Sequence, residues 1–158
     1  MQQPMLAPRA QAESVTEMTE YVLPQHANAL GTLFGGQLMA WVDLCGAICA
    51  SRHSRLTAVT AHVDDLQFDR PVRISEVVRL RACVTATFRT SLEIEVAAEG
   101  EDVRTGERWP CALARLTFVA IDEQRRPTPV PPLHLDTEEL VRSQRAGEER
   151  RAERLRRR

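Results

Sequence analysis

Hydrophobic and polar residues alternate along much of the chain, and this two-residue period predicts β-strands. In residues 77–87, apolar side chains at every second position alternate with polar or small ones, the pattern of a strand with one buried face. Residues 91–99 repeat the alternation after a short break, so the two segments are predicted to form a hairpin. The alternation of a further segment changes phase at Asp64 and Asp65, which predicts a bulge. The further predicted strands are 16–23, 58–68 and 109–121.

The segment 26–53, HANALGTLFGGQLMAWVDLCGAICASRH, predicts a loop followed by one long helix. Its large apolar side chains share one broad side at helical spacing: Leu38, Trp41, Val42, Cys45, Ile48 and Cys49. The opposite side carries small residues and one acid: Gly36, Ala40, Asp43, Gly46, Ala47 and Ala50. This much apolar surface predicts a helix wrapped by sheet, and small side chains permit the close approach of another backbone, which we expect to be a second copy of the chain.

The order of predicted elements is a strand, a helix and four strands in an antiparallel meander. An antiparallel sheet with one apolar face needs a cover, which the long helix can provide. We therefore predict an α+β fold in which a curved antiparallel sheet of about five strands wraps a long central helix.

Asp43 is the one charged residue among the small residues of this helix, and two interpretations are open. A structural aspartate would bind a backbone group or an arginine, because a lone buried acid needs a partner. A functional aspartate would lie in a dry cleft, where poor hydration makes it a stronger base. Asp43 lies seven residues after Gly36, about two turns into the helix, so it cannot be a simple N-terminal cap. This position favours the functional interpretation.

The loop NALGTLFGG precedes the helix and contains Gly31, Gly35 and Gly36. Glycines let the backbone approach a ligand closely, and the unpaired N–H groups of the first helical turn can hold an oxyanion. A tight turn without a ligand is the alternative. The chain has no GxGxxG motif and no lysine, which argues against a dinucleotide site or a P-loop.

Composition excludes several classes of protein. The net charge of -1 over 158 residues gives no general attraction to nucleic acid or to an anionic membrane. No apolar run approaches the roughly 18 residues of a membrane helix. The first residues lack the basic start and apolar core of a secretory signal, so we expect a cytoplasmic protein. Four cysteines without CxxC spacing are interpreted as buried free thiols that hold neither a disulfide nor a metal: Cys45, Cys49, Cys83 and Cys111.

Two terminal segments differ in composition from the central domain, which we place at residues 15–133. Residues 1–14 are predicted to be a flexible N-terminus. Residues 134–158 form a charged tail, with eight arginines and six acidic residues in the last 23 positions, and are predicted to be a solvated helix or disordered. The segment RRPTPVPP before this tail should run extended along the surface.

Four stretches closely resemble hotdog-fold acyl-CoA thioesterases that carry an N-x-x-G-x-x-F-G-G loop and an aspartate on the following helix. They are LPQHANALGTLFGGQLMAWVDLCGAICASRHS, AVTAHVDDLQFDRPV, TSLEIEV and TFVAIDEQRRPTPVPPL. The resemblance implies a homodimer with active sites between protomers, and a hexamer built as a trimer of dimers. It implies hydrolysis of acyl-CoA to a free fatty acid and CoA without a metal or other cofactor, since coenzyme A belongs to the substrate and product.

Residue by residue, the resemblance implies a catalytic pair of Asn28 from one protomer and Asp43 of the partner subunit. Asp43 would act as a general base on water, or as a nucleophile through a mixed anhydride. Asn28 would orient the water or the thioester. The Gly36 N–H, with Gly35 shaping the loop, would polarise the thioester carbonyl and stabilise the oxyanion.

The resemblance also indicates candidate contacts to CoA at Arg89, Thr90 and Ser91, where arginine suits phosphate recognition. A plain hairpin turn is the alternative there. Thr60 is a further candidate, for which plain β-propensity is the alternative. Relatives carry a Gly-Asp turn after FDRPV, whereas this chain has Ile-Ser-Glu at 74–76, which indicates a rebuilt turn.

Two other functions remain open on the sequence. Hotdog hydratases and dehydratases place a histidine beside an acid, and His26 is the residue that could fill this role. A non-catalytic acyl-CoA sensor is the second alternative. Otherwise His26, His53 and His62 are interpreted as surface or loop histidines.

Overall fold

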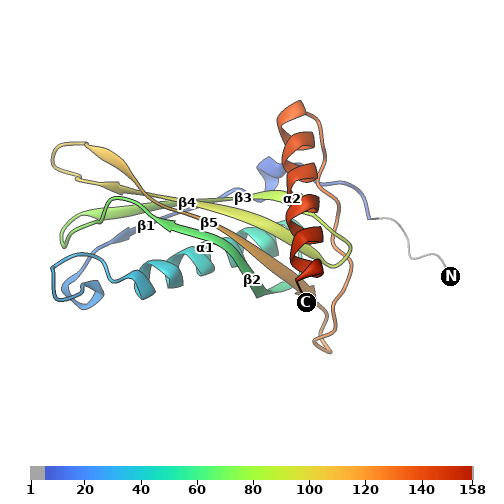
Figure 1. Ribbon diagram of the computed structural model, residues 1–158, viewed down its shortest axis with the longest axis horizontal. Coiled ribbons are helices and arrows are strands. Elements are labelled where there is room, and N and C mark those ends of the chain that lie inside the picture. The colour runs from blue at the N-terminus through green and yellow to red at the C-terminus, as the bar shows by residue number, and fades with distance from the viewer. Residues whose placement is uncertain (1–5, 158) are drawn as a thin grey trace.

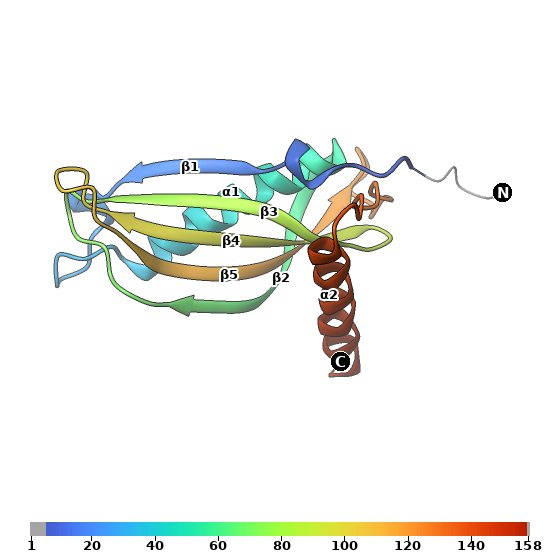
Figure 2. The ribbon, with the colours of Figure 1, turned by 90° about the horizontal axis from the view of Figure 1, so that it is seen from above.

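A computed structural model describes residues 6–157. Five strands form one antiparallel sheet in the order β1-β3-β4-β5-β2. The strands are β1 (Thr16–Tyr21), β2 (Thr57–Phe68), β3 (Val77–Thr87), β4 (Ser91–Glu101) and β5 (Arg108–Ile121). Two short 3-10 helices are Gln11–Glu13 and Pro24–His26. Helix α1 (Gly35–Ser54) runs along one face of the sheet, and helix α2 (Glu138–Arg156) lies across its other face at one end (Figures 1 and 2).

The predicted α+β architecture is confirmed. The predicted four-strand meander is wrong for the first of its strands: β3, β4 and β5 are consecutive neighbours, but β2 pairs with β5 at the far edge and β1 pairs with β3. Every predicted strand is present, and the long helix lies along the sheet as expected (Figure 1). The predicted bulge is also confirmed, because the pairing of β2 with β5 skips Asp64. The pairing skips Ala61 as well, so this strand has two irregularities within four positions. β2 is therefore an irregular strand at the edge of the sheet.

Helix α1 supplies the centre of the core. Five of its six predicted core side chains are buried: Leu38, Trp41, Val42, Cys45 and Cys49. Ile48 is only half-buried. The placement of Gly46 and Ala50 on the opposite side was wrong, since both face the sheet and are buried. A Cβ on Gly46 would lie 3.0 Å from ring atoms of Phe118, so the helix and sheet approach closely there. The curved sheet covers more of the helix than a narrow apolar stripe would indicate.

For residues 134–158 the sequence predicts a solvated helix or disorder; the structure has a helix, α2, but it is docked on the sheet. Arg150 donates to both carboxylate oxygens of Glu93, at 2.9 and 2.7 Å, and Glu93 is only 1% exposed. Burial alone raises the pKa of Glu93, but hydrogen bonds from Arg150 and Thr85 hold it below its usual value. Gly147 faces Ala86 so closely that a Cβ would lie 2.4 Å from that methyl group. Glycine is what allows the helix to approach the sheet at this point.

Segments on both sides of the predicted domain boundaries also pack against the sheet. The Arg9 N–H donates to the Pro132 carbonyl at 2.9 Å, and Ser14 is fully buried. The proline-rich segment does not run extended along the surface throughout, as predicted: Arg125 has a φ of 61° in a turn, and Val130 and Pro131 are buried, as is Leu133 directly after the segment. Residues 1–5, the start of the predicted flexible N-terminus, lie outside the described residues.

His53 differs from its interpretation as a surface or loop histidine, because it is fully buried. Its Nε2 lies 3.0 Å from the Pro131 carbonyl oxygen, where the proline-rich segment passes the end of α1. Burial lowers the pKa of His53 below its ordinary value of 6.5. The ring is therefore a neutral part of the core at neutral pH.

The rebuilt turn before β3 contains a strained residue. Ser75 has a φ of 73°, in the left-handed region that favours glycine. Its N–H donates to the Val22 carbonyl at 3.0 Å, and that bond holds the turn against the end of β1. The turn at residues 74–76 thus has a backbone shape that favours glycine, although it carries a serine.

Candidate functional site

Asp43 and Thr60 form the centre of the candidate site. Asp43 lies in the third turn of α1, and Thr60 lies on the edge strand β2. Thr60 donates a hydrogen bond from its hydroxyl to Asp43 Oδ1. Within residues 6–157, Asp43 Oδ2 accepts no hydrogen bond and forms no ion pair. One carboxylate oxygen is thus held in place, and the other is free to meet water.

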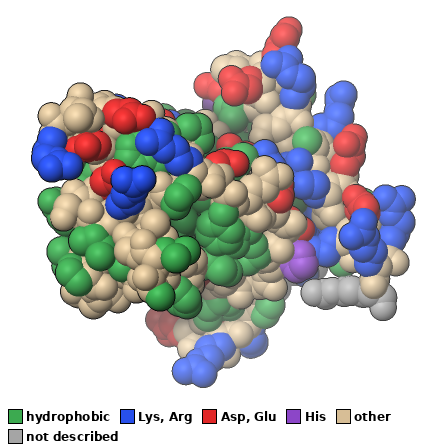
Figure 3. Space-filling view, turned by 60° about the vertical axis from the view of Figure 1, so that its left-hand side comes forward, with side chains coloured by type: hydrophobic (Ala, Val, Ile, Leu, Met, Phe, Trp, Pro, Cys, Tyr) green, Lys and Arg blue, Asp and Glu red, His purple; other side chains and the backbone are tan. Residues whose placement is uncertain are grey.

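The Asp43–Thr60 pair borders a pocket of about 210 Å³ between α1, β2 and β5. The remaining lining is entirely apolar: Met39, Val42, Val63, Leu66, Ala114 and Leu116. An apolar chain can pack against this lining while the carboxylate contacts a polar group attached to the chain. Part of the apolar surface of the molecule is visible in Figure 3, where hydrophobic side chains form a broad patch.

Asn28 lies in the loop before α1, and its hydrogen bonds within that loop use Oδ1 and one of the two Nδ2 N–H groups. Its Oδ1 accepts from the backbone N–H groups of Leu30 and Thr32, at 2.9 and 3.2 Å. Its Nδ2 donates to the Thr32 hydroxyl at 2.9 Å. No hydrogen bond joins Asn28 to Asp43 within the described protomer. The structure therefore does not bring the predicted catalytic pair together within one chain.

Gly35 and Gly36 open helix α1, as predicted. Within residues 6–157, neither of their N–H groups has an acceptor, whereas the next N–H, of Gln37, donates to the Phe34 carbonyl at 3.0 Å. The two free donors point from the positive end of the helix dipole. Gly35 also lines a second pocket of about 210 Å³ beside Phe68, which is mostly apolar but includes Asp69 and Arg70. The Phe34 ring lies over Gly36, where an added Cβ would come within 2.5 Å of a ring atom.

Of the three CoA candidates, Arg89 and Thr90 lie in the turn between β3 and β4, and Ser91 is the first residue of β4. The Arg89 and Thr90 carbonyls accept from Val130 and Ala120, at 3.1 and 3.0 Å. Arg89 is exposed, while Thr90 and Ser91 are partly buried. The register places Ser91 opposite Val119 on β5, and Val119 opposite a residue of β2 next to Thr60. This turn and Thr60 are therefore two strands apart on the same sheet.

The remaining reactive side chains have structural partners. The His26 ring packs edge-on against Trp41, with centroids 5.0 Å apart, and its Nδ1 lies 3.2 Å from the Leu23 N–H. Burial raises the pKa of Cys45 to about 11 and that of Cys49 to about 12, so these free thiols are protonated at neutral pH. No group of three or more His, Cys, Asp or Glu in residues 6–157 could hold a metal ion.

Sequence reasoning missed the partner of Asp43 and the residues that hold β2 from outside. Thr60 was selected as a CoA contact, but its hydroxyl binds Asp43. Asp64 was selected only for its bulge, yet it binds Arg154 of α2 at 2.6 and 2.8 Å. Two features of the sequence could have indicated this ion pair: an acid at a predicted bulge and an arginine-rich C-terminal segment. They do not specify which arginine binds the acid.

The fold is a central helix along a curved antiparallel sheet, and the site is an acidic side chain beside an apolar pocket. A family model described as the Thioesterase superfamily matches residues 30–107. The chain is 40% identical over 129 residues to an uncharacterized acyl-CoA thioester hydrolase of Bacillus subtilis, covering 82% of this chain and 75% of the relative. It is 35% identical over 138 residues to the acetyl-coenzyme A thioesterase of Rattus norvegicus, where the match spans 87% of this chain but 25% of that longer protein.

Solved structures agree. An apo-hexameric acyl-CoA thioesterase superposes with a TM-score of 0.90 at 35% identity, covering 96% of this chain and 97% of the other. An acyl-CoA hydrolase of Staphylococcus aureus, in complex with butyryl coenzyme A, coenzyme A and coenzyme A disulfide, has a TM-score of 0.85 at 30% identity over 94% and 91% of the chains. Variants of that enzyme with an aspartate, an asparagine or a threonine replaced by alanine are also similar.

The chain belongs to the Thioesterase superfamily. Its predicted resemblance to the hotdog-fold acyl-CoA thioesterases is confirmed by these relatives. No helix among the described residues is long and apolar enough to cross a membrane.

Proposed function

We propose that this protein hydrolyses acyl-CoA, with Asp43 as the general base. The observation that carries the proposal is the Asp43 carboxylate at the wall of an apolar pocket, with Oδ1 held by Thr60 and Oδ2 free. Asp43 takes a proton from water as the water oxygen bonds to the thioester carbonyl carbon. The tetrahedral oxyanion then collapses, the C–S bond breaks, and the thiolate of CoA recovers a proton from Asp43. The products are a fatty acid and CoA.

Gly36 lies about two turns from Asp43 on its own helix, so the oxyanion is stabilised by the free Gly36 N–H of the protomer that supplies Asn28, and Gly35 shapes the loop that presents it. The helix dipole adds a favourable positive potential at this position. Asn28 orients the water or the thioester from the partner subunit. Its loop suits such a role because Leu30 and Phe34, which flank the helix entrance, are 86% and 58% exposed. Apolar side chains this exposed indicate that another protein surface packs over them.

A homodimer follows from the same features. β2 is an edge strand, and Val59 and Val63 on it are exposed. On α1, Met39 and Leu44 are 43% and 50% exposed, so the helix also has an uncovered apolar side. A second copy paired at this edge would cover both surfaces and bring Asn28 to the site. A trimer of such dimers is the hexamer that we propose, supported by the hexameric relative.

CoA is proposed to run from this site toward Arg89, Thr90 and Ser91, where an exposed arginine suits its phosphates. The CoA complexes of the Staphylococcus aureus relative support this substrate class. The chain's own groups fill every role, so the proposal includes no cofactor. Four free cysteines suit the reducing cytoplasm that we propose as its compartment.

Thiol release from a panel of acyl-CoAs, from acetyl to palmitoyl, tests the proposal. Asp43→Asn keeps the shape and the Thr60 contact but removes the base, so turnover should fall by at least about a hundredfold while the melting temperature is kept. Asp136→Asn, at an exposed acid, is the matched control and should keep full turnover.

Other outcomes identify the alternatives. Hydration of an enoyl-CoA without thiol release would contradict hydrolysis and indicate a hydratase. Tight binding of acyl-CoA without any turnover would contradict it in favour of a sensor. Full activity of Asp43→Asn would remove Asp43 from the mechanism.

A further inference from the structure

Helix α2 lies over two irregular points of the sheet. The pairing of β3 with β4 skips Thr85, and the pairing of β2 with β5 skips Asp64. Ser143 of α2 donates to the Thr85 carbonyl at 2.9 Å, and Arg154 of α2 binds Asp64. A bulged residue has lost its ladder partner, so its position depends on other contacts. In this protein, α2 supplies one such contact at each of the two bulges.

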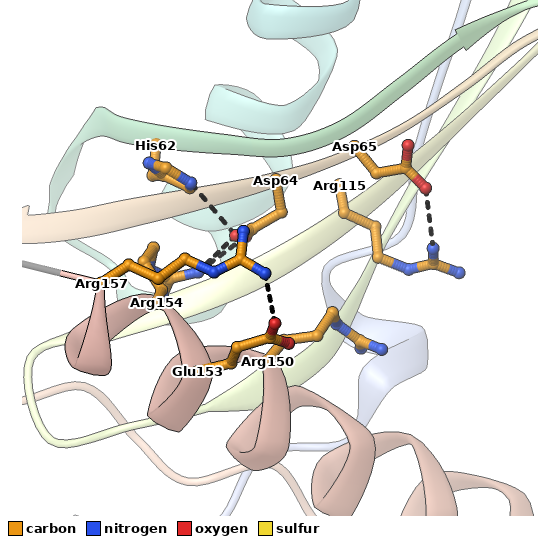
Figure 4. A pocket seen from close by; sticks show the side chains of 8 residues that line it. All are labelled: His62, Asp64, Asp65, Arg115, Arg150, Glu153, Arg154 and Arg157. Carbon is orange, nitrogen blue, oxygen red and sulfur yellow. Dashed lines mark hydrogen bonds and ion pairs between the residues drawn. The ribbon is translucent and has the colours of Figure 1, made fainter.

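Asp64 is held from several directions, although it lies at the sheet edge. Arg154 donates to Oδ1 and Oδ2 at 2.6 and 2.8 Å, and His62 Nε2 lies 3.2 Å from Oδ1 (Figure 4). Thr117 of β5 donates to Oδ2 at 3.4 Å. The side chains of Asp64 and Arg154 are only 13% and 15% exposed. A pair this enclosed is strongly destabilised when one partner is lost.

The pocket around this pair is not an open anion site. It measures about 470 Å³ and is lined by four arginines (Figure 4). Each arginine already binds a carboxylate: Arg115 with Asp65 and Glu95, Arg150 with Glu93, Arg154 with Asp64, and Arg157 with Glu153. With its charges paired internally, the cluster acts within the chain.

The other half of α2 is fixed to the middle of the sheet. Arg150 binds the buried Glu93 of β4, and Gln144 exchanges two hydrogen bonds of 2.9 Å with the backbone of Thr87 on β3. α2 therefore links inner strands to the edge strand β2. Arg154 is the point at which this link reaches β2.

Thr60 lies four residues before Asp64 on the same strand, with the Ala61 bulge between them. The β5 ladder is interrupted twice in this stretch, so it fixes the position of Thr60 less firmly than a regular ladder would. Thr60 in turn holds Asp43. The path runs from Arg154 through Asp64 and the bulged strand to the Thr60 hydroxyl.

We infer that Arg154 is a positioning residue for Asp43, acting through Asp64 and Thr60, so that the C-terminal helix holds the active carboxylate in its working orientation. This rests on the proposed role of Asp43 as the base. It gives α2 a part in turnover, although α2 lies on the face of the sheet opposite the active helix.

A double-mutant cycle tests the inference in the full-length protein. Arg154→Met should lower kcat by about tenfold and change KM by less than about twofold, because chemistry rather than binding is affected. In a Thr60→Val background, where the link to Asp43 is already cut, the same substitution should change kcat by less than about twofold. Arg154→Lys should restore part of the lost kcat. Arg142→Met, at an exposed arginine of the same helix, should match the wild type.

Hydrogen exchange adds a readout that does not depend on activity. Arg154→Met should speed amide exchange in residues 59–66, with the amides of β3 and β4 unchanged. The inference is overturned if Arg154→Met keeps the wild-type kcat, or if its effect on kcat is undiminished in Thr60→Val. It is also overturned if β2 exchange does not change. Wild-type protein without thiol release would overturn the proposed function as well, whereas an active wild type with an unaffected Arg154→Met would overturn this inference alone.

Discussion

Thr60 and Asp43 are joined by a hydrogen bond between the edge strand and the central helix, although they lie 17 residues apart in the sequence. The bond leaves Asp43 Oδ2 as the carboxylate oxygen free to act. Since a hydroxyl that donates to one oxygen restrains rotation of the carboxylate, Thr60 limits the directions in which Oδ2 can point.

Removal of the Thr60 hydroxyl should therefore slow the reaction. Thr60→Val keeps the shape of the side chain but loses the donor, and we expect kcat to fall by about tenfold. Thr60→Ser keeps the donor and should retain most of the turnover. Steady-state kinetics of the two variants measure the difference, and equal kcat values for Val and Ser would show that the hydroxyl has no role.

The two glycines at the start of α1 should differ in their tolerance of a methyl group. A Cβ on Gly36 would lie 2.5 Å from the Phe34 ring, whereas one on Gly35 would meet Phe68 at 3.8 Å, an ordinary contact. Gly36→Ala should displace the ring at the oxyanion donor and lower kcat by about tenfold or more. Gly35→Ala is the matched control and should lose less than about threefold. A larger loss in Gly35→Ala would contradict this assignment of the donor.

His53 should make folding stability depend on pH. Burial lowers its pKa in the folded state below 6.5, so the unfolded chain binds a proton that the folded chain resists. The stability contribution is therefore fully present above pH 6.5 and is lost as the pH falls through the folded pKa. Denaturant unfolding of wild type at pH 7.5 and 5 should show this loss. His53→Gln can keep a donor to Pro131 and should weaken the dependence, while His134→Gln, at an exposed histidine, should leave it unchanged.

Ser75 should be improved by glycine. Its φ of 73° is costly for a residue with a Cβ and is freely adopted by glycine. We expect Ser75→Gly to raise the free energy of unfolding by about 1 kcal/mol, measured by denaturant titration. Ser75→Ala, which keeps the Cβ, should not stabilise the protein. A stability gain in the alanine variant would show that the backbone angle is not the cause.

The strands and the central helix could be predicted because each has a local period that reports which side is buried. The alternation survives along most of β3 and β4 as buried apolar side chains facing α1. It fails at the bulge at Thr85, beyond which Ala86 faces Gly147 of α2, and the polar Glu93 is buried under that helix. The sequence places Gly46 on the wrong side of the helix. The helical period shows which side faces the sheet, but it does not show how far a curved sheet extends around the helix. The docking of helix α2 could be predicted least, because it depends on one glycine opposite Ala86 and on arginines whose partners are distant in sequence.

The chemistry of the site was predictable to a similar extent. Asp43 could be selected because a charge among small residues breaks a local rule, and the structure places it beside an apolar pocket. The role of Thr60 could not be predicted, because a threonine in a strand has an ordinary explanation and its partner is known only once the helix and strand are packed. Asn28 remains a prediction for the assembled dimer, since its loop occupies its side chain in one chain.

The two bulges in β2 also bear on solubility. A straight, apolar edge strand would accept any further strand in many registers and invite growth into fibrils. Skipped residues at Ala61 and Asp64 bend the strand, and the carboxylate of Asp64 lies beside the arginine cluster. An incoming strand must match both irregularities, which restricts the registers in which it can pair. The edge is thus protected against indiscriminate pairing and aggregation.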